Sequence, residues 1–585
     1  MNFITFKTLQ AFPSMKTKLL TLLLFSISVC MYAQDIPQHI SYTAVYDLMD
    51  ELANDGIIEI NSAIKPYSRS FIATQLLEAR QNRNLNSRQK ADIDFYLNEL
   101  SLEQGKLPDA KYHIWNNPLS KAAIVPPAFH YRDTLFRARI TPLLGLQVSY
   151  NKNAANPTIV KRWYGAEFQT MIGKHLSVYG SLRDISVDGD TLASYNYLNT
   201  LPGYEYKEAS YGGDFSDSRG GIKYSNDWSS IGLVKDNPVW GDSYRSSNIL
   251  SGRTPSFPMV TLNLKPTSWF ELNYFHAWLI SNVQDSANYY TDNQNVRFYR
   301  PANKFMAANM FTFKPIKGLR ISVGNSIIYG EPNVQAAYFI PIAFYKSIDH
   351  LLTKGTGTEN QNSQVFLNIS SRNIKHLHLY SSVFFDEVSL SRFSADNDEQ
   401  NPMSLQIGGK LSNFPVANLS LVAEYTYTNI ITYKHSLPTL TYASNTYNLG
   451  HYLGDNASEL YLALKYKPMR GLDLNLSYVD ARKGNDFEYL RRVGNVSVIR
   501  QIISQPVLDN VVWSSKSLNF TANYEVFSNV FALLNISYSD IRAFDSTSTI
   551  LYETEKTAAD YFSRFSNQYL QGKNTMVTAG INFGF

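Results

Sequence analysis

The carboxyl-terminal segment Thr575–Phe585 of this 585-residue chain alternates apolar side chains with small or polar ones. Side chains that alternate with a period of two lie on opposite faces of a β-strand. The apolar face would carry Val577, Ala579, Ile581, Phe583 and Phe585. About ten such residues, ending on an aromatic, are typical of a strand that crosses an outer membrane. The pattern therefore predicts a transmembrane β-strand at this end of the chain.

The composition agrees with a membrane barrel. Charged residues make up 17% of the chain, below the roughly 25% that is usual in soluble proteins. Aromatic residues reach 14%, which suits the aromatic girdles of membrane barrels. A tyrosine-rich secreted β-protein would have a similar composition, so this alternative stays open. The net charge of +4 is small for this length and argues against a nucleic acid partner.

Residues 1–33 are predicted to be a secretory signal peptide. Two lysines precede the apolar run Leu19–Val29, and Ala33 ends the expected cleavage site. No later segment has the 18 or so apolar residues that a membrane-spanning helix needs. The single cysteine, Cys30, lies inside this peptide, so we expect no disulfide or thiol chemistry after cleavage. The remaining chain also lacks clustered histidines and carboxylates, and we expect neither a metal site nor a cofactor.

Residues 35–110 are predicted to form a small α-helical domain on the periplasmic side. Three segments in this domain place apolar side chains at helical spacing, and Ser87 is expected to cap the third helix. Residues 111–135 contain prolines that interrupt regular patterns, and we interpret them as a linker. The barrel is then expected to occupy residues 136–585.

Segments with alternating apolar side chains recur through residues 136–585. Short turns and long polar stretches alternate as the connections between them. The clearest hairpin turns at Lys467–Gly471 between two leucine-rich strands. Counting strands in this way predicts an all-β, antiparallel outer-membrane barrel of about 18 strands. Because lipid cannot pair an open strand edge, the first strand, Arg137–Asn151, is expected to pair with the last, Thr575–Phe585. An even strand number places both ends of the barrel in the periplasm and the long loops at the cell surface.

One stretch of the barrel region, residues 231–258, is too rich in Gly, Pro and Asn to be strand throughout. It combines an aromatic ring with amide, carboxylate and guanidinium groups, which bind sugars by stacking on their C–H faces and bonding their hydroxyls. Alternatively, these residues fold a long loop into the lumen and satisfy its backbone. The candidate ligand-binding or lumen-organising residues are Asp236, Asn237, Trp240, Arg245, Asn248 and Arg253.

The same stretch resembles the Wzi family of capsule-assembly outer-membrane proteins. The matching residues are Asp236, Pro238, Trp240-Gly241, Leu250-Ser251 and Phe257-Pro258, with a weaker match over Glu331–Pro341. The chain departs from the family pattern at Gly252-Arg253-Thr254, and its loops are longer. These departures leave the identity of the ligand open.

The resemblance implies a binding protein rather than an enzyme. Members of the family look like outer-membrane lectins that anchor capsular polysaccharide or exopolysaccharide at the cell surface during capsule assembly. A repeating polymer would convert many weak sugar contacts into avidity. The implied partners are the polysaccharide, outer-membrane lipid and periplasmic export machinery. The helical domain would either dock to that machinery or seal the lower mouth of the barrel.

Two other classes of function stay open. A lipid-modifying enzyme of the outer membrane would need a serine and a histidine in reach of each other, but no Gly-x-Ser-x-Gly pattern is present. Its candidate histidines are His276, His350, His376 and His378. A passive porin or solute-uptake channel would carry facing rings of charge in its lumen. Inward residues compatible with such rings are Glu167, Arg183 and Arg320.

Overall fold

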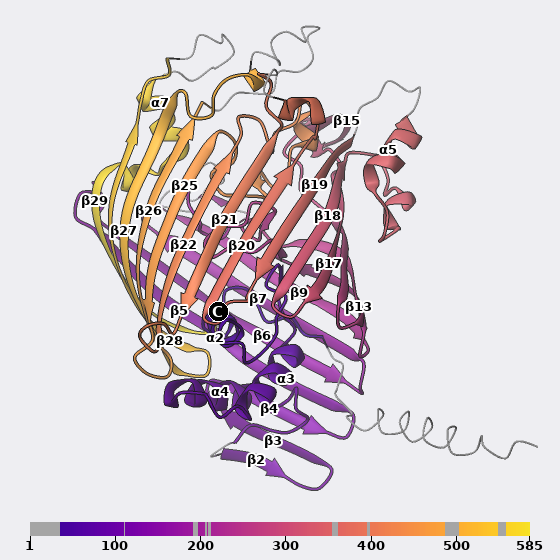
Figure 1. Ribbon diagram of the computed structural model, residues 1–585, viewed down its shortest axis with the longest axis vertical. Coiled ribbons are helices and arrows are strands. Elements are labelled where there is room, and N and C mark those ends of the chain that lie inside the picture. Colours follow the sequence, from indigo (N-terminus) through magenta and orange to yellow (C-terminus); the bar gives the residue numbers. More distant parts are fainter. Residues whose placement is uncertain are drawn as a thin grey trace, which may run out of the picture.

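A computed structural model gives the structure of this protein. It describes residues 35–109, 112–190, 197–204, 207–208, 212–353, 361–394, 398–485, 502–547 and 557–584. The predicted signal peptide, 1–33, and the terminal Phe585 lie outside the described residues. Figure 1 shows a barrel of long tilted strands with short helices gathered at its lower end.

Eighteen antiparallel strands of the described chain close into one barrel, which confirms the predicted fold class. Each barrel strand pairs with the next one along the chain, and the last pairs with the first. The strands are β5 (Phe136–Asn151), β6 (Thr158–Ile172), β7 (Leu176–Asp188), β9 (Gly213–Ser225), β10 (Ser229–Asp236), β13 (Phe257–Thr267), β14 (Phe270–Trp278), β17 (Phe305–Ile316), β18 (Leu319–Tyr329), β19 (Gln361–Ser371), β20 (Leu377–Phe385), β21 (Met403–Ser412), β22 (Leu419–Thr428), β25 (Ala457–Tyr466), β26 (Leu472–Gly484), β27 (Val511–Phe527), β28 (Val530–Ala543) and β29 (Gly572–Phe583).

The strand β29 closes the barrel by pairing with β5, from Met576 opposite Asn151 to Phe583 opposite Leu144. Lipid requires this closure, because it offers no hydrogen-bonding partner to the backbone of a free strand edge. On the outer face of β29, the side chain of Ile581 is 57% exposed. Exposure of a large apolar residue fits a surface that faces lipid. The predicted alternation and the predicted pairing of the first and last strands are both confirmed.

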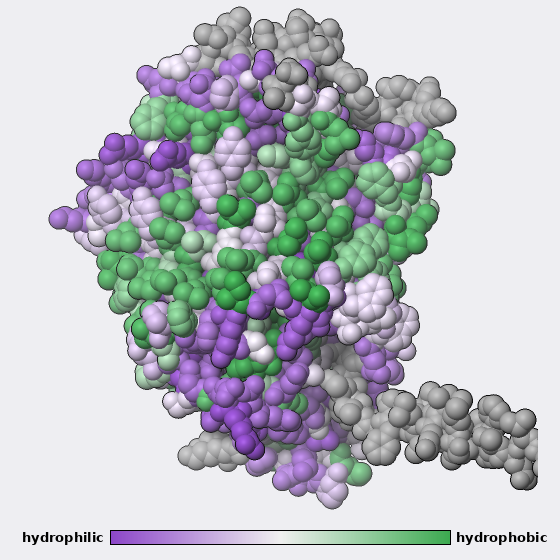
Figure 2. All heavy atoms as spheres, viewed as in Figure 1, coloured by the Kyte–Doolittle hydropathy of each residue, from purple (hydrophilic) through white to green (hydrophobic). Residues whose placement is uncertain are grey.

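The outer wall of the barrel is apolar, and much of the inner wall is polar. On β25 the outward Leu460, Leu462 and Leu464 are exposed, whereas the inward Glu459 is buried. Figure 2 shows a broad apolar belt across the middle of the molecule, between hydrophilic residues at both ends. Membrane barrels carry such a belt where lipid covers them.

Residues 111–135, which we interpreted as a linker, instead contain three strands: β2 (Tyr112–Asn116), β3 (Ser120–Val125) and β4 (Ala128–Asp133). Each pairs with the next, and β4 pairs with the first part of β5, with Phe129 opposite Ile140. The prolines Pro118, Pro126 and Pro127 lie in the turns between these strands, so they end strands rather than prevent them. The sheet extends below the barrel in Figure 1.

The predicted helices are α2 (Thr43–Asn54), α3 (Arg69–Arg80) and α4 (Ser87–Glu99), which together form the helical domain. Their apolar side chains, including Leu48 and Ile93, pack into one buried core. The predicted cap at Ser87 is wrong by one residue. Asn86 caps α4 instead, because its side chain accepts the backbone N–H of Gln89 while the Gln89 side chain accepts the backbone N–H of Asn86.

The helical domain lies in the lower end of the barrel, where ion pairs join it to the inner wall. Carboxylates of α2 face wall cations: Asp50 lies 2.7 Å from Arg372 and 2.9 Å from Lys410, and Asp47 lies 2.8 Å from Lys465. Burial alone would raise the pKa of the Asp50 carboxyl, but the charges of Lys410 and Arg372 outweigh it and hold that pKa well below its usual value. The domain therefore docks through an ionised acidic face.

Further contacts attach the helical domain on other sides of the barrel. The partners come from β9, β17, β5 and β27. The pairs are Asp35 with Lys223, Glu59 with Lys314, Glu99 with Arg139 at 3.1 Å, and the Tyr96 hydroxyl with Glu525 at 2.7 Å. Because these strands are spread around the barrel, the wall holds the domain at several points of the barrel's circumference.

Two loops also enter the lumen. Residues 237–256 contain β11 (Val239–Trp240) and β12 (Leu250–Ser251), and β11 pairs with β1 (Ile64–Lys65) of the helical domain. Residues 429–456 contain η3 (Pro438–Leu440), β23 (Ala443–Ser444) and β24 (Tyr447–Asn448). Side chains of both loops pack in one apolar cluster with the wall. Three segments far apart in sequence thus occupy the interior.

A third connection packs on the outside of the wall. It contains η1 (Ala336–Phe339) and α5 (Tyr345–Thr353), beside the barrel in Figure 1. The outward Asn309 donates hydrogen bonds to the carbonyl oxygens of Pro341 and Ala343, at 3.0 and 2.8 Å. The other small elements are β8 (Lys207–Glu208), β15 (Gln284–Thr291), β16 (Arg297–Pro301), η2 (Leu390–Phe393), α7 (Ala558–Phe565) and η4 (Gln568–Leu570). Among the described helices, none combines the length and apolar character needed to cross a membrane.

Neutralising the acidic face of α2 should release the helical domain. The double variant Asp47→Asn, Asp50→Asn leaves buried wall cations without a counter-charge, which costs about 3–5 kcal/mol for a buried pair. We expect proteases to cut within residues 35–109 of this variant much faster than in the parent, while the barrel keeps its folded electrophoretic mobility. The control is Asp94→Asn, which breaks an exposed pair with Arg80 and should change little. Equal protection of both variants would contradict the prediction.

The contribution of the ion-paired carboxylates Asp50 and Glu51 to docking should be lost only in acid. The pKa values of Asp50 and Glu51 are lowered in the folded protein, so their contribution is complete above the unfolded carboxyl pKa of about 4. It is lost as the pH falls through the folded values. Proteolysis of the helical domain should therefore increase as the pH falls below about 4. An increase between pH 6 and pH 8 would show that another group controls docking.

Candidate functional site

The six candidate residues lie on the loop 237–256 or at its base. Asp236 ends β10 opposite Phe257, the first residue of β13, so the loop leaves and rejoins the wall at one place. The carboxylate of Asp236 accepts a hydrogen bond from the Tyr179 hydroxyl at 3.3 Å. From there the chain turns inward, and Trp240 pairs with Ile64 of the helical domain.

Trp240 is enclosed by protein. It is 3% exposed, and its ring centroid lies 5.0 Å from that of Phe275 and 6.1 Å from that of Phe366, both in edge-to-face geometry. A ring packed in this way offers no free face to a sugar. Trp240 therefore packs inside the apolar cluster of the lumen.

The two candidate amides bond protein groups. Asn248 is fully buried and donates to the carbonyl oxygens of Ser382 and Ser404 at 3.2 and 2.9 Å, tying the loop to two wall strands. Asn237 donates to the carbonyl oxygen of Thr254 at 2.6 Å, across the base of the loop. These hydrogen bonds fix the backbone of the loop.

The two candidate arginines contact buried partners. Arg245 donates through Nε to Glu459 at 3.0 Å, and its guanidinium lies 5.7 Å from the ring centre of Tyr452. The guanidinium of Arg253 lies 5.1 Å from the ring centre of Tyr447, on the other inward loop. The structure thus gathers all six residues on one segment, but in separate contacts rather than around one open cavity.

A polar network that sequence reasoning missed joins this loop to the helical domain. The Tyr244 hydroxyl lies 3.0 Å from the Asp50 carboxylate, to which it donates, and 2.6 Å from Nδ1 of His378. Asp242 accepts a hydrogen bond from Asn368 of β19 at 2.8 Å. A cavity of about 170 Å³ lies beside these side chains. No local pattern marks the network, because each of these hydrogen bonds joins residues more than a hundred positions apart.

The candidate histidines do not assemble a catalytic triad. His378 Nε2 lies 2.9 Å from the Ser370 hydroxyl and 3.7 Å from the Asp242 carboxylate, so both groups use the same nitrogen. In a triad the carboxylate orients the ring through the other nitrogen, which here faces Tyr244. Both His378 and Ser370 are buried. Elsewhere, His276 contacts the Tyr329 hydroxyl at 2.7 Å, His376 contacts Asp55 at 2.8 Å, and His350 is exposed on α5.

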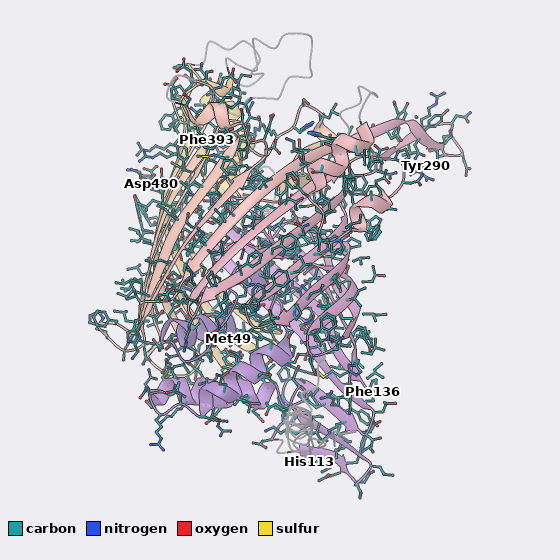
Figure 3. The ribbon with its side chains drawn as sticks, turned by 45° about the vertical axis from the view of Figure 1, so that its right-hand side comes forward. Met49, His113, Phe136, Tyr290, Phe393 and Asp480 are labelled. Carbon is teal, nitrogen blue, oxygen red and sulfur yellow. The ribbon has the colours of Figure 1, made fainter. Side chains whose placement is uncertain are left out.

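Solvent-exposed aromatic side chains gather on the hairpin of β15 and β16, which sequence reasoning missed. This hairpin pairs only with itself. Tyr290 and Phe298 are 55% and 42% exposed, and their rings stack at 5.3 Å. On the opposite face, Tyr289 contacts Tyr299 at 5.9 Å, and Arg297 lies over the Tyr289 ring. Figure 3 shows Tyr290 on a hairpin that reaches sideways from the upper rim.

The described residues form no group of three or more His, Cys, Asp or Glu side chains that could hold a metal ion.

The fold and the lumen define a class of protein: a large outer-membrane barrel filled by an amino-terminal helical domain and inward loops. The family model described as capsule assembly protein Wzi matches residues 192–550 of this chain, which is more than half of it. The chain belongs to this family.

Among solved structures, the chain is similar to Wzi of Escherichia coli, an outer-membrane protein involved in group 1 capsule assembly and described as a carbohydrate-binding β-barrel. The two share 11% identity with a TM-score of 0.55, over 94% of this chain and 100% of that one, which shows a common fold. Pseudomonas aeruginosa OccD3 and OccK8 also match, each at 10% identity over 76% of this chain. They are covered to 90% and 97%, with TM-scores of 0.38 and 0.40. No curated protein sequence matches.

Truncating Trp240 should destabilise the barrel. Trp240→Ala leaves a cavity among buried rings, and such changes cost about 3–5 kcal/mol. We expect a lower denaturant midpoint for unfolding. The loss of folded electrophoretic mobility with increasing denaturant measures this midpoint. Trp115→Ala is the control, because that ring is 41% exposed on β2. A similar shift in both variants would mean that Trp240 has no special role in the lumen.

Proposed function

We propose that this protein binds capsular polysaccharide or exopolysaccharide at the cell surface during capsule assembly. Membership of the Wzi family over residues 192–550 carries the proposal. The similar barrel from Escherichia coli is described as carbohydrate-binding, which supports the same class of ligand here.

In this proposal, the helical end of the barrel faces the periplasm, and the long connections face outward. With eighteen strands, β5 begins and β29 ends at the same rim, and the helical domain leads into that rim. Short turns such as Lys467–Gly471 also lie there, as in other outer-membrane barrels. Ile114 and Leu119, exposed at 51% and 76% near the β2–β3 turn, would offer periplasmic export machinery an apolar contact.

The contents of the lumen favour binding over passive passage. The charged residues that a porin would place around its pore are engaged here. Arg183 pairs with Asp217 at 2.6 Å, and Arg320 donates to the carbonyl oxygen of Ile60 at 2.6 Å. The helical domain and two loops occupy the space between them.

The surface hairpin of β15 and β16 is the site that we assign to the polysaccharide. Its rings present flat apolar faces to solvent, and sugars stack on such faces through their C–H groups. Arg297 and Arg300 are exposed on the same hairpin and can donate hydrogen bonds to hydroxyl or acidic groups. Repeated weak contacts along one polymer would add up to firm retention.

Removing the stacked ring pair should weaken binding. The double variant Tyr290→Ala, Phe298→Ala is expected to lower affinity for the host strain's capsular polysaccharide about tenfold or more, given about 0.5–1.5 kcal/mol per ring contact plus lost area. Affinity electrophoresis of the detergent-solubilised protein measures this. The control is Phe527→Ala, an exposed ring at the opposite end of the barrel. Unchanged binding by the folded double variant would reject this hairpin as the site. Absent binding together with open conductance of the parent would favour a porin.

A further inference from the structure

A cleft of about 510 Å³ separates the helical domain from one side of the barrel wall. The start of α3, including Phe71, lines one side, and β9, β10, β13 and β14 line the other. Trp228 and Lys265 at its edge are exposed, whereas Ser230 further in is buried. The cleft therefore runs inward from the helical end, and its volume lies within the usual range of ligand sites.

Aromatic rings form the apolar part of this cleft. Trp228, on the turn between β9 and β10, is 52% exposed. The ring of Phe71 lines the cleft from the helical domain, with the ammonium group of Lys265 at 5.9 Å from its centre. A half-exposed indole at the edge of a cleft provides a flat face on which a ligand can stack.

Polar groups of the wall lie beside these rings. The Asn263 side chain donates to Asn273 at 2.6 Å, and Asn273 donates to Oε1 of Glu271 at 2.9 Å. This chain of hydrogen bonds orients the Glu271 carboxylate at the cleft. Asp227 and Lys265 have no ion-pair partner within the described parts of the chain. The cleft thus offers acceptors and a cation next to an aromatic face.

This combination fits a sugar better than a lipid or a peptide. Lipid would contact the outward stripe of the wall, whereas Lys223 and Asn273 belong to the inward one. A peptide that adds as a strand needs a free sheet edge, but β9, β10, β13 and β14 are paired on both sides. Sugars present apolar C–H faces and many hydroxyls together. We propose that the cleft is a second saccharide site, in which one sugar ring stacks on Trp228 and neighbouring hydroxyls bond Glu271 and Asp227.

The second site requires no binding at the surface hairpin, which lies at the other end of the barrel. In the orientation proposed above, it opens to the periplasm. Two glycans of the same chemistry can reach it there: a capsular polymer on its way to the surface, and glycan strands of the cell wall. The protein would then contact polysaccharide on both sides of the membrane.

Oxidative footprinting of the full-length protein in detergent tests this proposal. The two probes are oligosaccharides cut from the host strain's capsular polysaccharide and cell-wall glycan fragments released by a muramidase. We expect one probe to slow oxidation of Trp228 several-fold, and the effective probe identifies the source. Trp269 is the internal control: it is 55% exposed on the next short turn, but its ring stacks on the outward Phe313. Protection of neither residue, or equal protection of both, overturns the proposal.

Variants separate this site from the surface hairpin. Trp228→Ala should bind the protecting probe about tenfold more weakly in calorimetry, and Trp269→Ala should bind it as the parent does. The hairpin variant Tyr290→Ala, Phe298→Ala should keep full protection of Trp228, whatever happens to its polysaccharide binding. If the hairpin variant loses that protection, the cleft is not an independent site.

Discussion

The hydrogen-bonded seam between β29 and β5 closes the barrel, and lipid makes that closure obligatory. An unpaired strand edge in hydrocarbon would leave each backbone N–H and C=O without a partner. Closing eighteen strands in this way encloses an interior too wide for wall side chains alone to fill. Such an interior holds either water or additional protein. Here the helical domain and two long loops enter it, so the rest of the structure follows from how these segments meet the wall.

Two kinds of interaction hold the segments that fill the lumen. At the helical end, Asp47 and Asp50 meet Lys465, Lys410 and Arg372. Buried ion pairs lose much of their attraction to desolvation, so we regard these as fixing where the domain sits. Farther in, the cluster around Trp240 is apolar and adds burial without a charge penalty. The ion pairs thus set the position of the domain at one level of the barrel, and the apolar cluster packs the two loops at another.

The sequence predicted what depends on neighbouring residues. The alternation in Thr575–Phe585 and the turn at Lys467–Gly471 revealed strands and hairpins, because the side-chain period is a local property. It did not predict the contact between Asp50 and Arg372, which are 322 residues apart. The prolines in residues 111–135 predict a linker, although they lie in the turns of a sheet. The aromatic hairpin was missed because its rings stand in adjacent pairs among polar residues, Tyr289-Tyr290 and Phe298-Tyr299, and do not alternate.

The role of the candidate residues could not be predicted from the sequence for a different reason. A tryptophan, amides and arginines on a Gly-rich loop can bind a sugar or hold a loop, and the residue types are the same in both cases. Burial decides between them: Trp240 and Asn248 face protein on all sides. In the stretch that carries the family resemblance, these two side chains therefore pack inside the filled barrel. The two sites that we propose for saccharides therefore lie where rings stay exposed, around Tyr290 and Trp228 at opposite ends of the barrel.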